Sequence, residues 1–168
     1  AQGTGTGPAL LFSNIKDYNK ADSRCRSLFA CSLSSYRRIA MMLGLSPDTH
    51  PRDLVKICRS ILTGTVAPKL VNSGPVKENI VKGKDVDLSR LPVQTCWPGD
   101  AGPLLTWALT VTRGPHKPRQ NLGIYRQQVI GPREVIMRWL PHRGGALDFR
   151  EFSIACPGQP FPLAVALG

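Results

Sequence analysis

The sequence is short of acidic residues, and it contains neither cysteine pairs nor long hydrophobic runs. The 11 Asp and Glu residues are outnumbered by 22 Lys and Arg, so the 168-residue chain has a formal net charge of +11. No stretch approaches the roughly eighteen apolar residues that a membrane-spanning helix needs. The five cysteines are irregularly spaced and form no CxxC pair. This pattern argues against a disulfide framework or a zinc site and favours reduced thiols in the cytoplasm.

The excess of positive charge admits several interpretations. A basic protein can bind nucleic acid, an anionic membrane surface or a phosphorylated ligand, or it can simply carry a solvated basic surface. The sequence has neither a recognition-helix signature nor an RNA-binding aromatic motif, so we expect no nucleic-acid partner. A nucleic-acid binder would show an affinity that falls steeply with salt.

Two helices are predicted in the first half of the chain. Ser34 or Ser35 can cap a helix that runs to about Leu43. A second helix is capped by Thr49, has a proline in its first turn and ends at Gly64. One face of the second helix is apolar at helical spacing and consists of Leu54, Ile57, Cys58, Ile61 and Leu62.

The chain is predicted to divide at the turn-forming Ser73-Gly74-Pro75. Residues 1–73 are interpreted as a helical flank of an α/β domain, to which Pro8–Ile15 adds a short buried strand. Residues 74–168 are dominated by short strand-like runs. The charged segment that follows the boundary is predicted to be looped, with Asp85 and Asp87 in a solvated turn.

Residues 104–112 alternate between large apolar and small side chains, which predicts a strand. Its small face, which includes Thr110 and Thr112, can hold a flat ligand close to the sheet or simply face water. Arg150–Ile154 and Phe161–Leu167 are predicted as further strands. Several short strands with tight turns and few helical patterns predict a small β-barrel.

The segment Gln120–Gly145 combines strand-like runs with polar residues. Ile124–Ile130 and Val135–Leu140 are separated by Gly131-Pro132-Arg133-Glu134, which predicts a β-hairpin. Arg126 and Arg138 lie within the two runs. Burying an arginine is costly unless it is paired, so an anionic partner at this surface is one interpretation. An edge hairpin with solvent-facing arginines is an equally acceptable one.

The residues that follow the hairpin are His142-Arg143-Gly144-Gly145. A Gly-Gly pair beside Arg and His would let backbone N–H groups approach an oxyanion closely. His142 taken alone is more typical of a surface or core histidine than of a metal ligand.

Longer motifs in this half of the chain resemble a known family. The segments are PVKENIVKGKDVDLSRLPVQTCWPGDAGPL, LLTWALTVTRGPHKPRQN, QNLGIYRQQ and IMRWLPHRGGALDF. They closely resemble the UbiD family of decarboxylases, and most of all its 3-polyprenyl-4-hydroxybenzoate decarboxylase type of ubiquinone biosynthesis. The resemblance is strong over Pro75–Gly168 and looser over Pro8–Leu70.

The resemblance implies an α+β fold. Residues 1–73 would form a partial N-terminal α/β region, and residues 74–168 part of an FMN-binding split β-barrel. Family members run to several hundred residues, and this sequence lacks an initiator Met and stops on the apolar PFPLAVALG. We therefore expect a fragment or one chain of a split enzyme.

The resemblance also implies a cofactor, prenylated FMN, whose phosphate the family binds through Mn2+ with K+ nearby. It makes Asn121 a metal ligand through its side-chain oxygen, and His142 matches a position that contributes a histidine in part of the family. Arg126 matches the catalytic arginine that holds the substrate carboxylate. The positions that match cofactor-contacting segments are Thr106, Ile124, Tyr125, Arg126, Arg138, Trp139, Leu140, Arg143 and Gly144.

The implied activity is the reversible, non-oxidative decarboxylation of an aromatic or α,β-unsaturated carboxylic acid. A flavin prenyltransferase would supply the cofactor, and the protein would be a homo-oligomer. A polyprenylated substrate would draw a cytoplasmic enzyme to the inner face of the membrane. The family's metal-binding glutamate and catalytic carboxylates lie beyond this chain, and Glu134, Asp148 and Glu151 do not match them. The alternative is a flavin- or phosphate-binding subunit, or an inactive fragment of a split enzyme.

Overall fold

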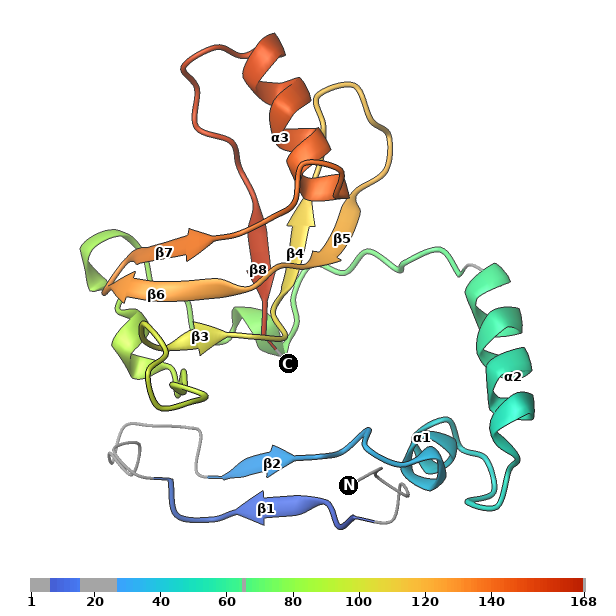
Figure 1. Ribbon diagram of the computed structural model, residues 1–168. Coiled ribbons are helices and arrows are strands. Elements are labelled where there is room, and N and C mark those ends of the chain that lie inside the picture. Colours follow the sequence, from blue (N-terminus) through green and yellow to red (C-terminus); the bar gives the residue numbers. More distant parts are fainter. Residues whose placement is uncertain (1–6, 16–26, 65, 168) are drawn as a thin grey trace. The chain divides into compact units, whose positions relative to one another are not determined.

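The computed structural model describes residues 7–15, 27–64 and 66–167 (Figure 1). The chain forms two compact units, Ala1–Ile80 and Val81–Gly168. Helices and sheets both occur, which confirms the predicted α+β class. The domain limits 1–73 and 74–168 stay a prediction. Among the described residues, no helix is long and apolar enough to cross a membrane.

The described residues of the first unit form a two-stranded sheet, two α-helices and one 3₁₀-helix. Its elements are β1 (Leu10–Phe12), β2 (Leu28–Ala30), α1 (Tyr36–Met42), α2 (Pro51–Thr63) and the 3₁₀-helix η1 (Pro75–Lys77). The side chain of Ser35 caps α1 by accepting a hydrogen bond from the backbone N–H of Arg38 at 3.2 Å, as predicted. The cap of α2 is His50 rather than Thr49, because the Thr49 hydroxyl donates to the Ser46 carbonyl at 2.7 Å.

The strand predicted within Pro8–Ile15 exists as β1, but the prediction that it is buried was wrong. Leu11 of this strand is 68% exposed. The apolar face of α2 is similarly open, with Leu54 buried but Leu62 81% exposed. Local patterns identify which face of an element is apolar, whereas burial depends on what covers that face.

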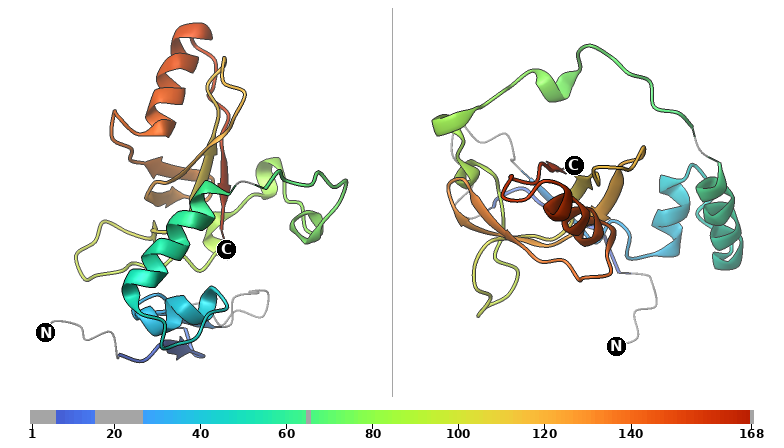
Figure 2. Two further views of the ribbon diagram at one scale, coloured as in Figure 1. Left: turned by 90° about the vertical axis from the view of Figure 1, so that its right-hand side faces the viewer. Right: turned by 90° about the horizontal axis from the view of Figure 1, so that it is seen from above.

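In the second unit, the described residues 81–167 form two three-stranded sheets and one α-helix. Its elements are the 3₁₀-helices η2 (Gly83–Asp85) and η3 (Leu88–Arg90), the strands β3 (Leu104–Leu105), β4 (Leu109–Thr112), β5 (Asn121–Ile124), β6 (Gln127–Gly131) and β7 (Glu134–Met137), the helix α3 (Gly144–Ala155) and the strand β8 (Ala164–Ala166). The strand orders are β3-β6-β7 and β5-β4-β8, and all pairs are antiparallel. In Figure 1, β6 and β7 run across the direction of β4 and β8. Helix α3 packs against β4 and β5 (Figures 1 and 2).

Two predicted strands are each divided between the two sheets. The single strand predicted over residues 104–112 is broken into β3 and β4. The run Ile124–Ile130 is also broken, because β5 ends at Ile124 and β6 begins at Gln127 after two intervening residues. A strand that changes sheets makes a corner between them. The alternation of side chains continues through such a corner, so periodicity alone does not reveal it. The predicted hairpin itself is confirmed, with Gly131 opposite Glu134 in the β6–β7 pair.

The threonine face of β4 is the buried face, so the interpretation that it faces water was wrong, whereas a flat ligand on this face stays a prediction. Thr110 and Thr112 are 0% and 2% exposed, whereas Trp107 is 73% exposed. The buried hydroxyls have partners on other elements. Gln127 donates through Nε2 to Thr110 Oγ1 at 3.1 Å, and Thr112 donates through Oγ1 to Asp148 Oδ2 at 2.7 Å. A hydroxyl can be buried at low cost when it is hydrogen-bonded in this way.

The segment Arg150–Ile154, predicted as a strand, belongs to α3. The buried residues of α3 include Gly145 and Asp148, one helical turn apart. Neither of these two residue types is counted as apolar, so the spacing of apolar residues does not reveal the buried face of this helix. The strand predicted within Phe161–Leu167 is confirmed as β8.

Candidate functional site

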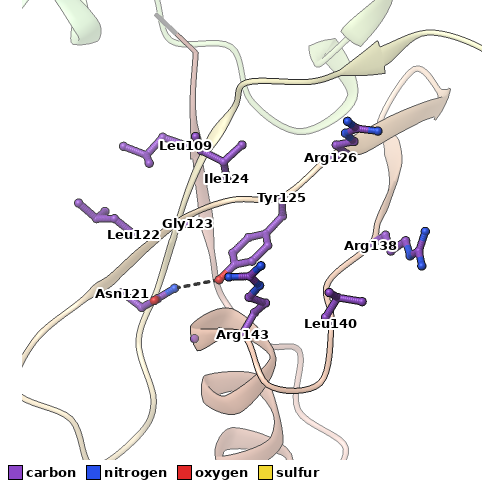
Figure 3. A pocket seen from close by; sticks show the side chains of 11 residues that line it. Leu109, Asn121, Leu122, Gly123, Ile124, Tyr125, Arg126, Arg138, Leu140 and Arg143 are labelled. Atoms are coloured by element: carbon purple, nitrogen blue, oxygen red, sulfur yellow. Dashed lines mark hydrogen bonds between the residues drawn. The ribbon is translucent and has the colours of Figure 1, made fainter. Parts of the chain in front are cut away.

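An open pocket of about 720 Å³ lies beside β5 and the N-terminus of α3 (Figure 3). The residues that line it are Leu109, Asn121, Leu122, Gly123, Ile124, Tyr125, Arg126, Arg138, Leu140, Arg143 and Gly144. Three segments that are separate in sequence therefore meet here: the start of β4, β5 with the corner that follows it, and the connection from β7 to α3.

Most of the predicted site residues share this pocket, and three of them lie outside its lining. Thr106 is half-buried between β3 and β4, and His142 is exposed. Trp139 packs behind the pocket, edge-on to Tyr125 with ring centroids 5.6 Å apart. The assigned cofactor, metal and catalytic roles remain predictions for all of these residues.

Sequence reasoning missed three lining residues. Leu122 and Gly123 lie between predicted residues of the same strand, so their position in the motif could have identified them. Leu109 lies opposite Ile124 in the β4–β5 pair, and this register is visible only in the structure.

The pocket gathers three arginines. The backbone N–H of Arg138 donates to the Arg126 carbonyl at 3.2 Å, which holds these two residues side by side across the continuation of the hairpin. Arg143 is the N-cap residue of α3. The three side chains are exposed, and none forms an ion pair with the residues that the structure describes. All three line one pocket, as an anionic partner would require, and all three are also as exposed as the solvent-facing alternative predicts.

The N-terminus of α3 adds to this positive potential. The first turn of a helix presents unpaired N–H groups and a partial positive charge. The first turn of α3 contains no acidic residue that would neutralise it. Gly144 lines the pocket, but the N–H of Gly145 is already used, since it donates to the Tyr125 hydroxyl at 2.8 Å. The predicted Gly-Gly approach to an anion therefore applies to Gly144 only.

Asn121 presents its two side-chain atoms to different neighbours. Its Nδ2 donates to Thr112 Oγ1 at 3.1 Å. The same atom donates to the Tyr125 hydroxyl at 3.4 Å (Figure 3). Its Oδ1 faces Gly144 so closely that a Cβ built on that glycine would lie 2.0 Å from it. Within the described part of the chain, this oxygen accepts no hydrogen bond.

The residues present fit an anionic ligand and supply one oxygen ligand to a cation. Arginines and a helix N-terminus are the usual partners of a phosphate. An amide oxygen is a suitable ligand for Mn2+. The described residues contain no group of three or more His, Cys, Asp or Glu that could hold a metal ion, so these residues alone do not complete a metal site.

A buried carboxylate, that of Asp148, is linked to Asn121 through the Thr112 hydroxyl. Asp148 is 2% exposed and is paired with Lys117 at 2.8 Å, and Lys117 also pairs with Glu151 at 3.0 Å. Burial raises the pKa of Asp148, but the hydrogen bonds from Lys117 and Thr112 outweigh it, and the pKa lies below its ordinary value of 3.8. The hydrogen bonds to Asp148 and Glu151 raise the pKa of Lys117 above 10.5.

We expect Asp148 to stabilise the fold in a pH-dependent way. A carboxylate with a lowered pKa contributes stability above its unfolded-state pKa near 3.8, and that contribution is lost as pH falls through the folded-state value. The wild type should therefore unfold at a higher temperature than Asp148→Asn above pH 3.8, and this difference in unfolding temperature should disappear below that pH. Glu151→Gln, at the exposed end of the same cluster, is the control and should change little. Parallel acid profiles for wild type and Asp148→Asn would contradict this role.

Comparison with known proteins identifies both parts of the chain. The model of the UbiD 3-octaprenyl-4-hydroxybenzoate carboxy-lyase Rift-related domain matches residues 69–168, and the model of the corresponding N-terminal domain matches residues 1–58.

Solved structures give the same result. The closed form of Sedimentibacter hydroxybenzoicus vanillic acid decarboxylase is 28% identical, with a TM-score of 0.81 over 96% of this chain and 34% of that chain. Klebsiella pneumoniae 3,4-dihydroxybenzoic acid decarboxylase is 28% identical, with a TM-score of 0.79 over 96% of this chain and 32% of that chain. An evolved dimeric form of the UbiD-class enzyme HmfF from Pelotomaculum thermopropionicum, in complex with prFMN, is 27% identical, with a TM-score of 0.76 over 95% of this chain and 35% of that chain.

These similarities confirm the predicted fold, an N-terminal region followed by part of a split barrel. The chain spans about a third of the length of the solved structures it matches.

Proposed function

Because the chain belongs to the UbiD family of carboxy-lyases, we propose that the protein decarboxylates an aromatic or α,β-unsaturated carboxylic acid, reversibly and without net oxidation. The observation that supports this proposal is that one pocket is lined by Arg126, Arg138 and Arg143, which have no ion-pair partners among the described residues. A guanidinium binds a carboxylate or a phosphate through two parallel, charge-assisted hydrogen bonds. The pocket is therefore suited to an acid and to a phosphorylated cofactor together.

The cofactor in this proposal is prenylated FMN, as in the HmfF complex. Loss of CO2 leaves an electron pair on carbon, and prenylated FMN supplies the electron sink for it. Arg143 and the first turn of α3 would hold the phosphate, and Asn121 Oδ1 would bind Mn2+, with K+ nearby. The aliphatic wall formed by Leu109, Leu122 and Ile124 would exclude water from the ring system.

Arg126 is the residue that we assign to the substrate. It would hold the carboxylate, fixing the bond to be broken in one orientation and balancing the negative charge before CO2 leaves. A backbone hydrogen bond holds Arg138 beside Arg126. Arg138 would keep the electrostatic potential of the pocket positive when the Arg126 guanidinium is bound to the substrate carboxylate. Protonation of the product carbon needs a carboxylic acid, and no acidic residue is among those lining the pocket in the described part of the chain.

That lack favours a second candidate function, a flavin-binding subunit or inactive part of a split enzyme. The 168 residues alone should then bind flavin weakly and release no CO2, since the residues that the structure describes supply neither a lining carboxylate nor a complete metal site. Turnover by the purified chain with cofactor and Mn2+ would contradict this expectation.

The substrate class that we propose is a hydroxylated benzoic acid. The similar decarboxylases are named for vanillic and 3,4-dihydroxybenzoic acid, and the matching family model for a polyprenylated 4-hydroxybenzoate. The finer proposal is the 3-polyprenyl-4-hydroxybenzoate decarboxylase of ubiquinone biosynthesis. A polyprenyl tail would bring a cytoplasmic homo-oligomer to the anionic inner face of the membrane, with which the net charge of +11 is compatible.

The test is to express the full-length protein with a flavin prenyltransferase and Mn2+. We expect a flavin absorbance in the purified protein and release of CO2 from 4-hydroxybenzoate or its 3-prenylated form. Comparison of the two acids decides whether the tail is recognised. A colourless protein that releases no CO2 from either acid would refute the proposed activity.

A further inference from the structure

We propose that a hydrogen-bonded relay from Asp148 through Thr112 determines which side-chain atom of Asn121 faces the pocket. This inference rests on the proposed function, in which Asn121 Oδ1 binds a divalent cation together with an anionic ligand. The relay would make Asp148 and Thr112 positioning residues, although neither lines the pocket.

The relay depends on the polarity of each hydrogen bond. An ionised carboxylate can only accept, so Asp148 Oδ2 obliges the Thr112 hydroxyl to donate its single proton, over 2.7 Å. The Thr112 oxygen can then only accept from its other neighbour. Asn121 meets this requirement with Nδ2, at 3.1 Å.

An asparagine amide is nearly symmetrical in shape, so packing alone does not distinguish its two orientations. With Nδ2 directed at Thr112, Oδ1 must point the opposite way, toward Gly144 and the pocket. Asn121 Nδ2 also lies 3.4 Å from the Tyr125 hydroxyl, but this group can donate or accept a hydrogen bond, so Thr112 is the neighbour that decides the orientation. A reversed amide would present an NH2 group to the pocket and would repel a cation.

The far end of the relay explains why Asp148 stays in the acceptor state. Lys117 donates to Asp148 Oδ1 at 2.8 Å, which occupies the other oxygen of the carboxylate. Thr112 and Asp148 are each 2% exposed, so water does not compete for these bonds. The groups of the cluster are Lys117 and Glu151 at the surface, Asp148 and Thr112 in the interior, and Asn121 at the pocket.

The chain offers a matched pair of variants to test this. Thr112→Val removes the hydroxyl that links Asp148 to Asn121 and keeps the shape of the side chain. Thr110→Val removes a hydroxyl from the same buried face of β4, where it accepts from Gln127 outside the relay. The two variants should lose similar amounts of thermal stability. Thr112→Ser keeps the hydroxyl and should restore the behaviour of the wild type.

Two measurements on the full-length protein separate positioning from stability. The first is Mn2+ binding in the presence of FMN, followed by electron paramagnetic resonance. We expect Thr112→Val to weaken Mn2+ affinity by about 10-fold or more, the usual effect of losing a partner that orients a metal ligand. Thr110→Val and Thr112→Ser should stay near the wild-type value. Equal affinities in Thr112→Val and Thr110→Val would overturn the relay.

The second measurement needs no cofactor. Side-chain amide exchange of Asn121, followed by NMR, should be slow in the wild type and in Thr110→Val and fast in Thr112→Val. If the wild type binds no Mn2+ with FMN, the proposed function fails while slow exchange still supports the relay. Fast exchange in the wild type, or slow exchange in Thr112→Val, would refute the relay itself.

Discussion

Replacing Arg126 with alanine is expected to lower kcat/KM for decarboxylation by about 100-fold or more, equivalent to about 2.8 kcal/mol. The proposed role of Arg126 is to hold the substrate carboxylate, and its guanidinium has no ion-pair partner in the described residues. Loss of such a charge-assisted contact weakens binding and misaligns the bond that breaks. The measurement is steady-state CO2 release by the flavin-loaded, full-length protein.

Two further variants sharpen this test. Arg126→Lys keeps the charge but loses the planar two-pronged donor, so it should recover only part of the activity. Arg133→Ala removes an exposed arginine from the turn of the same hairpin, outside the arginine-lined pocket, and should leave activity within a few-fold of the wild type. Equal losses in Arg126→Ala and Arg133→Ala would show that Arg126 contributes only to the net charge.

Replacing Gly144 with alanine should abolish tight flavin binding. The new Cβ would lie 2.0 Å from Asn121 Oδ1 and 2.7 Å from its Cγ, which is far inside van der Waals contact. Asn121 would have to move away, breaking its bonds to Thr112 and Tyr125. We expect the FMN dissociation constant, measured by fluorescence quenching in the presence of Mn2+, to rise by about 10-fold or more.

The control for this prediction is Gly131→Ala at the hairpin turn. There the nearest atom to the new Cβ is Glu134 Oε2 at 3.3 Å, at the end of a flexible side chain that can move. Both variants add one methyl group to a glycine of the same unit. Unchanged FMN affinity in Gly144→Ala would show that Asn121 is not held against α3 when the flavin binds.

Features that depend on neighbouring residues were predictable. Ser35 caps α1 through a hydroxyl three residues from its partner, and the β6–β7 hairpin turns at Pro132 and Arg133, between the paired Gly131 and Glu134. The signals for both lie within a few residues, where chain geometry limits the choices. The cap of α2 was misplaced by one residue because Thr49 found a local carbonyl instead.

Features that depend on distant residues were not predictable from pattern. The apolar alternation of residues 104–112 is real, yet the threonine face is the one inside, because Gln127 and Asp148 approach it from other elements. Part of α3, the segment Arg150–Ile154, was predicted as a strand, because the buried stripe of the helix contains Gly145 and Asp148. Hydrophobic periodicity has no means of recognising a buried carboxylate on a helix whose hydrogen-bond partners lie on a strand and in a loop.

The sequence by itself determined the family and most of the pocket, since its motifs place Asn121, Arg126, Arg138 and Arg143 in two short segments whose local geometry is specified by turns and caps. Tertiary structure alone decided that these segments meet Leu109 and the N-terminus of α3, and that Asp148 lies behind Asn121. The physical reason is that a side chain becomes buried, paired or oriented only through groups brought to it by folding. Thr112 and Asp148 are 36 residues apart in the chain and 2.7 Å apart in the structure.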